Sequence, residues 1–280
     1  MDPREALAQL GGVASTAELL AHTTRAQLRA ALESGEVRRL TRGQYALPDA
    51  DLARKRAAQL NGVVSHLSAA LLHGWEVVEP PTWPWVTVPR NAKIRDRRRV
   101  HLVYADLEDR VVTGCVRTVI DCGRRLPFSQ ALTVADSALR RGDVDQDVLV
   151  RAAAEVRGKG AARARRVAEH ADGRAANPFE SVLRALAIEA GLPVEAQGLV
   201  TAGGRDLHPD VVDREHRLAI EADSWTWHGG RDAFERDCWR YTVLTVAGWR
   251  VLRFTYSQVM REPEWVAARL RDAIATQLSA

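Results

Sequence analysis

The chain has 280 residues, of which 46% are hydrophobic and 27% charged, as in a soluble globular protein of two or three domains. It has no run of about 18 apolar residues, so the composition excludes a membrane-spanning helix. The net charge is only +4, and all but three of the 40 basic residues are arginine, the better bidentate ligand for phosphate. Because a GC-rich genome produces the same bias, the composition is compatible with a nucleic-acid partner but does not require one.

The three cysteines, Cys115, Cys122 and Cys238, form no Cys-x-x-Cys pair. Neither a zinc site nor a disulfide framework is therefore expected. The segment from Asp2 to Glu5 is charged and lacks the apolar core of a secretory signal. These features together predict a cytoplasmic protein.

The first fifty residues predict a winged helix-turn-helix. A short helix over Pro3–Leu10 precedes two helices that each begin with a capping-box pattern, at Ser15–Glu18 and at Thr24–Gln27. The segments Val37–Leu40 and Gln44–Leu47, joined by an Arg-Gly turn, predict a two-stranded wing. Outward cations and polar groups suit a recognition helix, so DNA contacts are expected from Arg25, Gln27, Arg29 and Arg42. A helical protein-interaction module with solvated arginines is the alternative.

The middle of the chain predicts a mixed α/β segment followed by helices. Helices are expected at Asp51–Leu60 and Ser65–His73, strands at Val86–Val88 and Val100–Tyr104, and mainly helices from Val116 to Ala171.

Two features of this middle segment each have two interpretations. His66 and His73 are seven residues apart and so lie on one helix face. Because no acidic third ligand lies close in the sequence, a buried, hydrogen-bonded pair is predicted in preference to a metal site. A basic cluster between the expected strands is either a solvated loop or a phosphate-contacting loop; it consists of Lys93, Arg95, Arg97, Arg98 and Arg99.

These two N-terminal parts resemble the antitoxin-like transcriptional regulators of the AbiEi family of actinobacteria. The likeness covers roughly residues 3–125, and it is carried by Gly11-Gly12-Val13, Ser15–Leu20, Arg42–Pro48 and Ser65–Gly74. It implies a DNA-binding winged helix followed by a mixed interaction domain.

The C-terminal part contains three acids close to two apolar runs. Asp210 lies within the run Leu207–Val212, and Glu221 and Asp223 end the run that begins at Leu218. Two neighbouring strands with acids at their ends would bring the carboxylates to one edge of a sheet. Mg²⁺ binds through one or two carboxylates together with substrate phosphate, so this pattern indicates phosphodiester hydrolysis.

The elements expected after Asn177 follow the order αβββαβ, with the first three strands at Val194–Val200, Leu207–Val212 and Leu218–Asp223 and a closing helix from Pro263. The order and its motifs resemble the PD-(D/E)xK nuclease core, and within it the very-short-patch mismatch-repair endonucleases. The likeness covers about residues 177–278 and is carried by Pro209-Asp210, Glu221-x-Asp223, Trp227-His228, Asp237-x-x-Arg240 and Gly248–Phe254. It implies that Asp210, Glu221 and Asp223 hold the metal.

The lysine of the nuclease motif is missing, because position 223 is aspartate and no lysine follows Lys159. The very-short-patch enzymes also lack this lysine and use a histidine after a tryptophan, which His228 matches. An imidazole there is a candidate general base or acid. The alternatives are a surface histidine and an inactive site.

Other candidate residues have both a structural and a functional interpretation. Glu180 is a capping-box residue that often reaches the metal in these nucleases. Arg240 forms a helical ion pair with Asp237, or contacts the phosphate while Asp237 holds it. Trp225 and Trp227 pack in the core, or stack on bases as DNA-binding residues.

The sequence thus predicts a multidomain α+β and α/β protein, with a winged helix-turn-helix at 1–50, a mixed middle domain at 51–174 and a restriction-endonuclease-like core at 175–280. The expected function is a Mg²⁺- or Mn²⁺-dependent DNA endonuclease in DNA repair or phage defence. The rival is a DNA-binding regulator or antitoxin with an inactive nuclease-like domain. Either function is compatible with a cognate protein, such as a toxin, that binds the middle domain. No organic cofactor and no membrane partner are expected.

Overall fold

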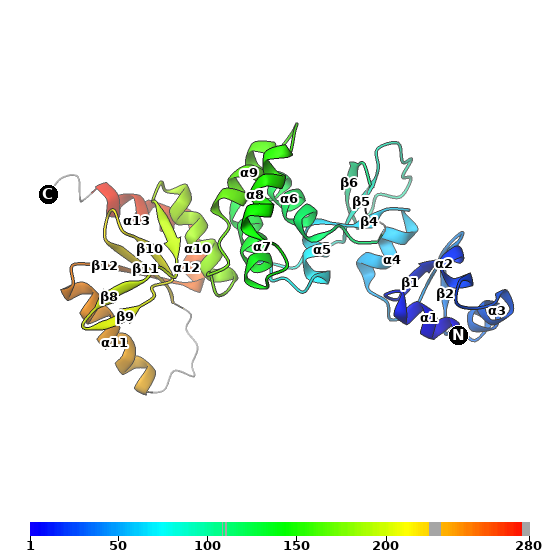
Figure 1. Cartoon of the computed structure of the whole chain (residues 1–280), viewed down its shortest axis with the longest axis horizontal. Helices are drawn as coiled ribbons and strands as arrows, with labels where there is room; N and C mark the ends of the chain where they lie inside the picture. The colour runs from blue at the N-terminus through cyan, green and yellow to red at the C-terminus, as the bar shows by residue number, and fades with distance from the viewer. Residues whose placement is uncertain (108, 110, 224–230, 276–280) are drawn as a thin grey trace. The chain divides into compact units, whose positions relative to one another are not determined.

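The structure is a computed structural model that describes residues 1–107, 109, 111–223 and 231–275 (Figure 1). The chain forms two compact units, one of Met1–Gly74 with Glu79–Asp121 and one of Trp75–Val78 with Cys122–Ala280. The division into three domains remains a prediction. Across the described residues, no helix is both long and apolar enough to cross a membrane.

The N-terminal fifty residues form a small helical layer on a three-stranded antiparallel sheet. The elements in chain order are α1 (Pro3–Gln9), β1 (Val13–Ser15), α2 (Thr16–Leu20), α3 (Arg25–Glu33), β2 (Arg38–Thr41) and β3 (Gln44–Ala46). The sheet order is β1-β3-β2, which confirms the predicted β2–β3 hairpin. Both predicted capping boxes are confirmed, with Ser15–Glu18 opening α2 and Thr24–Gln27 opening α3. The winged helix-turn-helix assignment itself stays a prediction.

The first unit also contains a second small sheet. Its elements are α4 (Leu52–Gln59), β4 (Val63–Val64), α5 (His66–Leu72), β5 (Trp85–Pro89) and β6 (His101–Ala105). The strand order is β4-β5-β6, with β5 and β6 parallel.

The two histidines of this region make separate contacts. His66 Nδ1 lies 2.9 Å from Ser65 Oγ, and the imidazole stacks on Trp85. His73 Nε2 lies 2.8 Å from the Thr113 carbonyl oxygen. Both imidazoles have hydrogen-bond partners as predicted, but only His66 is buried, and His73 is half-buried.

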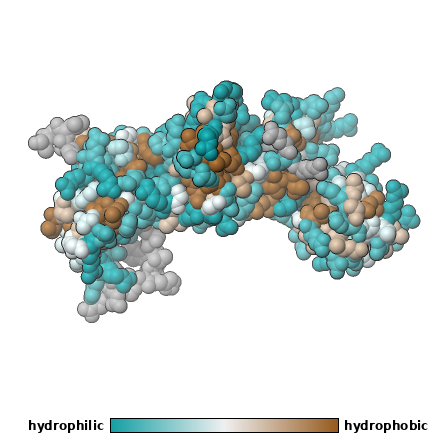
Figure 2. Space-filling model, in the orientation of Figure 1, coloured by the Kyte–Doolittle hydropathy of each residue, from teal (hydrophilic) through white to brown (hydrophobic). Residues whose placement is uncertain are grey.

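Four helices follow: α6 (Cys115–Arg125), α7 (Phe128–Arg140), α8 (Gln146–Glu155) and α9 (Ala161–His170). The boundary between the two units falls within α6, and the other three helices belong to the second unit. Hydrophobic residues are visible over α7 to α9 on the face drawn in Figure 2, and α8 exposes Val148 and Val150.

The C-terminal domain is built on a four-stranded sheet of order β12-β11-β10-β7. Its elements are α10 (Pro178–Glu189), β7 (Val194–Ala196), β8 (Val200–Ala202), β9 (Arg205–Leu207), β10 (Val211–Asp213), β11 (Leu218–Asp223), α11 (Arg231–Val246), β12 (Arg250–Thr255), α12 (Tyr256–Arg261) and α13 (Pro263–Ala275). Strand β10 is antiparallel to both β7 and β11, whereas β11 and β12 are parallel.

The alternation of side chains along β11 separates two cores. Leu218 and Ile220 pack in the core that includes residues of α10, α12 and α13, and Ala219 packs in the other core with Leu244 of α11. Residues i and i+2 share a face of a strand. The Glu221 side chain therefore lies on the α11 face of the sheet.

Two predicted strands are corrected by the structure. The segment Leu207–Val212 is not one strand, since β9 ends at Leu207 and β10 begins at Val211. Pro209 has no backbone N–H to donate, which explains the interruption. The predicted strand from Val194 to Val200 is likewise divided, because Gln197 adopts φ 49° between β7 and β8.

A buried ion pair joins two helices of the second unit. Arg184 Nη2 of α10 donates to both carboxylate oxygens of Asp136 of α7 at 2.7 Å, and the two residues are 2% and 0% exposed. Breaking a buried pair leaves one uncompensated charge in a medium of low polarity.

We predict that Arg184→Met lowers the free energy of unfolding by about 3–5 kcal/mol, measured by urea denaturation, because Asp136 is left buried without its cation. The double variant with Asp136→Leu should recover much of this loss. As the control, Arg269→Ala removes an exposed pair with Asp272 and should change stability by less than about 1 kcal/mol. Equal effects of Arg184→Met and Arg269→Ala would contradict the prediction.

Candidate active site at one edge of the C-terminal sheet

The sheet register brings two acids face to face. Val211 pairs with Ile220 and Val212 with Ala219 in the antiparallel β10–β11 ladder, so Asp210 stands opposite Glu221 where this ladder ends. The sequence placed both acids at strand ends. In the structure Asp210 instead immediately precedes β10, and it meets the far end of β11 because the two strands run in opposite directions. The predicted meeting of these carboxylates is confirmed, with a different strand polarity.

The Asp210 carboxylate is held by two donors. Its Oδ2 accepts from the backbone N–H of Ala222 at 2.8 Å, and its Oδ1 accepts from Gln197 Nε2 at 3.0 Å. The Gln197 amide also donates to Glu180 Oε2 at 3.0 Å, and therefore links two acids. Gln197 was not singled out from the sequence, because its position depends on the turn between β7 and β8.

Glu180 has the contacts of a helix-capping residue. Its Oε2 accepts from the Ala176 N–H and its Oε1 from Asn177 Nδ2, while its own N–H donates to Asn177 Oδ1. Burial, and to a lesser extent the charge of Asp210, raises the pKa of the Glu180 carboxyl. The Asn177 cap on the Glu180 N–H is formed, but the predicted capping box is not, because the Glu180 carboxylate accepts from the Ala176 N–H in place of the Asn177 N–H. The same side chain is connected to Asp210 through Gln197.

Glu221 is the most strongly perturbed acid of this group. It is 4% exposed, and its Oε1 lies 2.9 Å from Arg240 Nη2 in an ion pair whose angles do not make a hydrogen bond. Burial is the main reason why the pKa of Glu221 is raised to about 8, and the charge of Asp210 adds to it against the opposing effect of Arg240. The carboxyl is therefore largely protonated at neutral pH unless another cation approaches it.

Asp223 has a different partner. It forms an ion pair with Arg253 of β12, whose guanidinium lies 4.2 Å from the centroid of the Tyr241 ring. Burial, together with the charge of Glu221, raises the pKa of Tyr241 to about 12. Within the described part of the chain, no three groups of His, Cys, Asp or Glu lie close enough to share a metal ion. The three-carboxylate metal set stays a prediction, and the structure brings two of its members together.

Arg240 is positioned by the backbone and by Glu221. Its Nη2 donates to the His208 carbonyl oxygen at 2.7 Å and lies beside Glu221. Among the described residues its contacts do not include Asp237, so the predicted pairing of Arg240 with Asp237 is wrong. The contact with His208 explains this, since it directs Arg240 toward the carboxylates of the sheet edge.

Other predicted site residues lie elsewhere. Trp225, Trp227 and His228 are outside the described residues. The predicted DNA contacts of the first unit are exposed on α3 and in the β2–β3 turn, at Arg25, Gln27, Arg29 and Arg42. The Gln27 side-chain oxygen also caps α3, where it accepts from the Thr24 N–H at 3.0 Å.

The pair Asp210 and Glu221 fits a divalent cation. Glu221 Oε1 is buried and has no hydrogen-bond partner among the described residues, although a buried acceptor normally has one. Two facing carboxylate oxygens are the hard ligands that Mg²⁺ prefers, and Mg²⁺ completes its coordination with water and substrate. A cation there would also offset the burial and the Asp210 charge that together raise the pKa of Glu221.

Comparisons with known proteins identify this domain and relatives of the whole chain. Residues 179–274 match the model of the restriction-endonuclease-like family REase_MTES_1575. Two proteins of Mycobacterium tuberculosis are each 30% identical to this chain over 259 residues, which cover 88% of this chain and 96% of theirs. They are uncharacterized protein Rv2248 of strain H37Rv and uncharacterized protein MT2308 of strain CDC 1551. The crystal structure of the Mycobacterium tuberculosis protein RV2827C matches 72% of this chain and 88% of its own, with a TM-score of 0.34 and 14% identity.

The raised pKa predicts how stability depends on pH. Between pH 4.5 and about pH 8, Glu221 keeps its proton in the native state but loses it in the unfolded chain. The contribution of this carboxyl to the free energy of unfolding is therefore fully present below pH 4.5 and is lost as the pH rises to about 8. Glu221→Gln removes this dependence. In EDTA, the free energy of unfolding of the variant relative to wild type should rise across that window, by on the order of a few kcal/mol, and then level off.

Urea denaturation at a series of pH values measures this difference. Val148→Ala, an exposed change on α8 that removes no titratable group, is the control and should give a difference independent of pH. A pH-independent difference for Glu221→Gln would contradict the assigned pKa.

Proposed function

Because this chain belongs to the family of the mycobacterial proteins Rv2248 and MT2308, and because residues 179–274 form a restriction-endonuclease-like domain, we propose that it is a metal-dependent DNA endonuclease. One observation carries the proposal: the buried carboxylate of Glu221 faces Asp210 with an arginine beside it. Two acids and a cation at one sheet edge suit the hydrolysis of a phosphodiester.

In this proposal Asp210 and Glu221 hold Mg²⁺ or Mn²⁺. The bound ion supplies Lewis-acid activation of the phosphate and of the attacking water. Gln197 and the Ala222 N–H fix the direction of the Asp210 carboxylate, as supporting donors do around metal ligands. Glu180 shares the Gln197 amide, so it restrains the same arrangement.

The arginines of the site bind the substrate phosphate. Arg240 lies beside Glu221, and if Glu221 held a cation, Arg240 would be free to neutralise a phosphate oxygen. Asp223 holds Arg253 beside this edge, which supplies a second cation for the strand. His228 is proposed to transfer a proton to or from the reacting oxygen.

The N-terminal fifty residues are proposed to be a winged helix-turn-helix that docks the protein on duplex DNA. The supporting observations are the helix pair α2–α3, the β2–β3 hairpin, and the exposed cations Arg25, Arg29 and Arg42. In such modules the helix enters the major groove and the hairpin contacts the backbone. A role in DNA repair or phage defence follows from this combination of docking and cleavage.

A second function is favoured by a specific observation. The C-terminal domain contains no lysine, and both Glu221 and Asp223 are paired with arginine. An inactive nuclease-like domain in a DNA-binding regulator or antitoxin would have these features, and a partner protein would then bind the middle domain.

Cleavage of labelled single-stranded, duplex and mismatched DNA distinguishes the two functions. We predict cutting that needs Mg²⁺ or Mn²⁺ and is blocked by EDTA. Asp210→Asn and Glu221→Gln should each lower the rate by more than about a hundredfold, because each removes one of two metal ligands. Gln197→Ala should lower it by about 10- to 100-fold, and excess Mn²⁺ should restore part of the loss.

The control is Asp206→Asn, which changes an exposed carboxylate of β9 in the same domain and should cleave as wild type does. Wild-type protein that binds DNA and leaves every substrate intact would overturn the nuclease proposal in favour of the regulator.

The docking proposal makes a separate prediction. Arg25→Ala and Arg29→Ala should each weaken duplex binding and reduce the slope of log affinity against log salt concentration by about one, because each removes a phosphate contact. Fluorescence anisotropy with EDTA present measures this without cleavage. Arg4→Ala, an exposed change on α1, is the control, and an unchanged salt slope in both α3 variants would contradict the docking role.

A further inference from the structure

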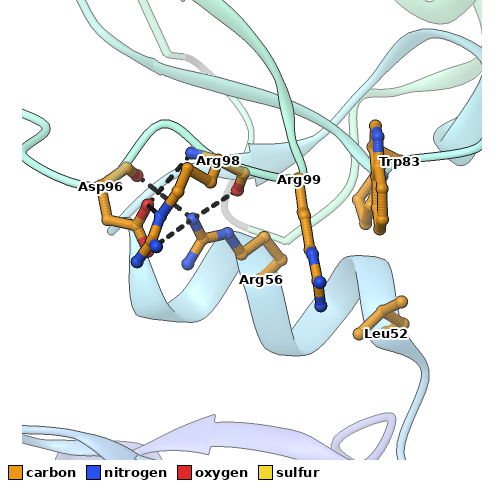
Figure 3. A pocket seen from close by; sticks show the side chains of 7 residues that line it. Leu52, Arg56, Trp83, Asp96, Arg98 and Arg99 are labelled. Atoms are coloured by element: carbon orange, nitrogen blue, oxygen red, sulfur yellow. Dashed lines mark hydrogen bonds and ion pairs between the residues drawn. The ribbon is translucent and has the colours of Figure 1, made fainter.

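The first unit contains a pocket that the proposed nuclease and docking roles do not use. Its volume is about 600 Å³, and it is lined by Leu52, Arg56, Trp83, Pro84, Asp96, Arg98 and Arg99 (Figure 3). The lining comes from helix α4, from the segment before β5 and from the basic loop that precedes β6. From the sequence alone, this basic loop could be either solvated or phosphate-binding.

One side of the pocket is apolar and aromatic. Trp83 is 38% exposed and Leu52 is 63% exposed, so both present apolar surface to the pocket that they line. Trp83 is followed by a proline, so it belongs to neither a strand nor a helix and presents its ring at the surface. An exposed indole beside a concave surface is a platform on which another planar ring can stack.

The opposite side is cationic. Arg56 Nη2 donates to the carbonyl oxygens of Asp96 and Arg98 at 3.1 Å each, so it fixes the loop to α4. The Asp96 carboxylate pairs with Arg98 at 3.1 Å and with Arg56 at 3.6 Å. The pocket lining thus contains three guanidinium groups and one carboxylate, and it carries a net positive charge.

Arg99 connects the two sides. Its guanidinium lies over the face of the Trp83 ring, 5.4 Å from the centroid, and Figure 3 shows it between Trp83 and Arg56. A base that stacks on this face takes the place of the guanidinium, which stays close enough to pair with the attached phosphate. Its backbone has φ 55°, which is uncommon for a residue with a side chain and fixes the direction in which the side chain leaves the loop. Arg99 has no carboxylate at ion-pair distance among the described residues, so its charge is available for a ligand.

A planar aromatic platform next to guanidinium groups that outnumber the neighbouring carboxylate can recognise a base joined to a phosphate. In a duplex both faces of a base are already stacked, so only an unpaired base can lie on Trp83. We propose that this pocket binds one unpaired nucleotide of a nucleic-acid strand, with its base on Trp83 and its phosphate at Arg99 and Arg98. The site is separate from the proposed metal centre and does not depend on cleavage.

Binding of labelled oligonucleotides to the full chain in EDTA tests the proposal independently of the nuclease. Trp83→Ala and Arg99→Glu should each weaken single-stranded binding by about tenfold, because stacking and charge pairing contribute at that scale, and should leave duplex binding unchanged. Trp83→Phe keeps an aromatic face and should retain most of the affinity. Arg90→Ala removes an exposed pair with Asp106 outside the pocket and should bind as wild type does.

Three further arms identify the source of the nucleotide: a DNA strand, an RNA strand and a free nucleoside monophosphate. Tighter binding of either strand than of the monophosphate, lost in Trp83→Ala, supports the proposal. Equal affinity for the monophosphate overturns the assignment to a strand. Wild-type affinity of both Trp83→Ala and Arg99→Glu, with unchanged thermal unfolding, overturns the site itself. Because EDTA is present throughout, an inactive nuclease leaves these outcomes unaffected.

Discussion

The placement of a carboxyl group in an apolar sheet is the constraint on which the C-terminal domain depends. Burial, with the charge of Asp210, raises the pKa of Glu221 to about 8, and the charge of Arg240 is the main effect that opposes this. Such a position costs stability, because the native state must keep a proton or find a cation. A site with this property is suited to a metal ion, whose charge removes the repulsion between Asp210 and Glu221.

The fold supplies this arrangement through strand direction and alternation. Antiparallel pairing of β10 with β11 places Asp210 opposite Glu221, while parallel pairing of β11 with β12 brings Arg253 to the same edge beside Asp223. Helix α11 adds Arg240 on the face that Glu221 shares. The first unit has its own exposed cations on α3 and around Trp83, and these are the contacts to nucleic acid that we propose for it.

Local patterns in the sequence predicted local structure well. Both capping boxes and the hairpin of the first unit followed from residues within a few positions of each other, and the acids of β11 followed from the apolar run before them. Contacts across the fold were not visible in this way. Gln197 reaches Asp210 through a turn with φ 49°, and the interruption at Pro209 separates β9 from β10. Arg240 meets His208 instead of Asp237, because tertiary contact outweighs helical spacing.

A structure of the protein crystallised with Mn²⁺, with the ion located by anomalous scattering, tests the central claim most directly. The account predicts one ion at about 2.0–2.3 Å from carboxylate oxygens of both Asp210 and Glu221, with Arg240 no longer paired with Glu221. An ion bound elsewhere, or a Glu221 that keeps its pairing with Arg240 while Mn²⁺ saturates the protein, would contradict it.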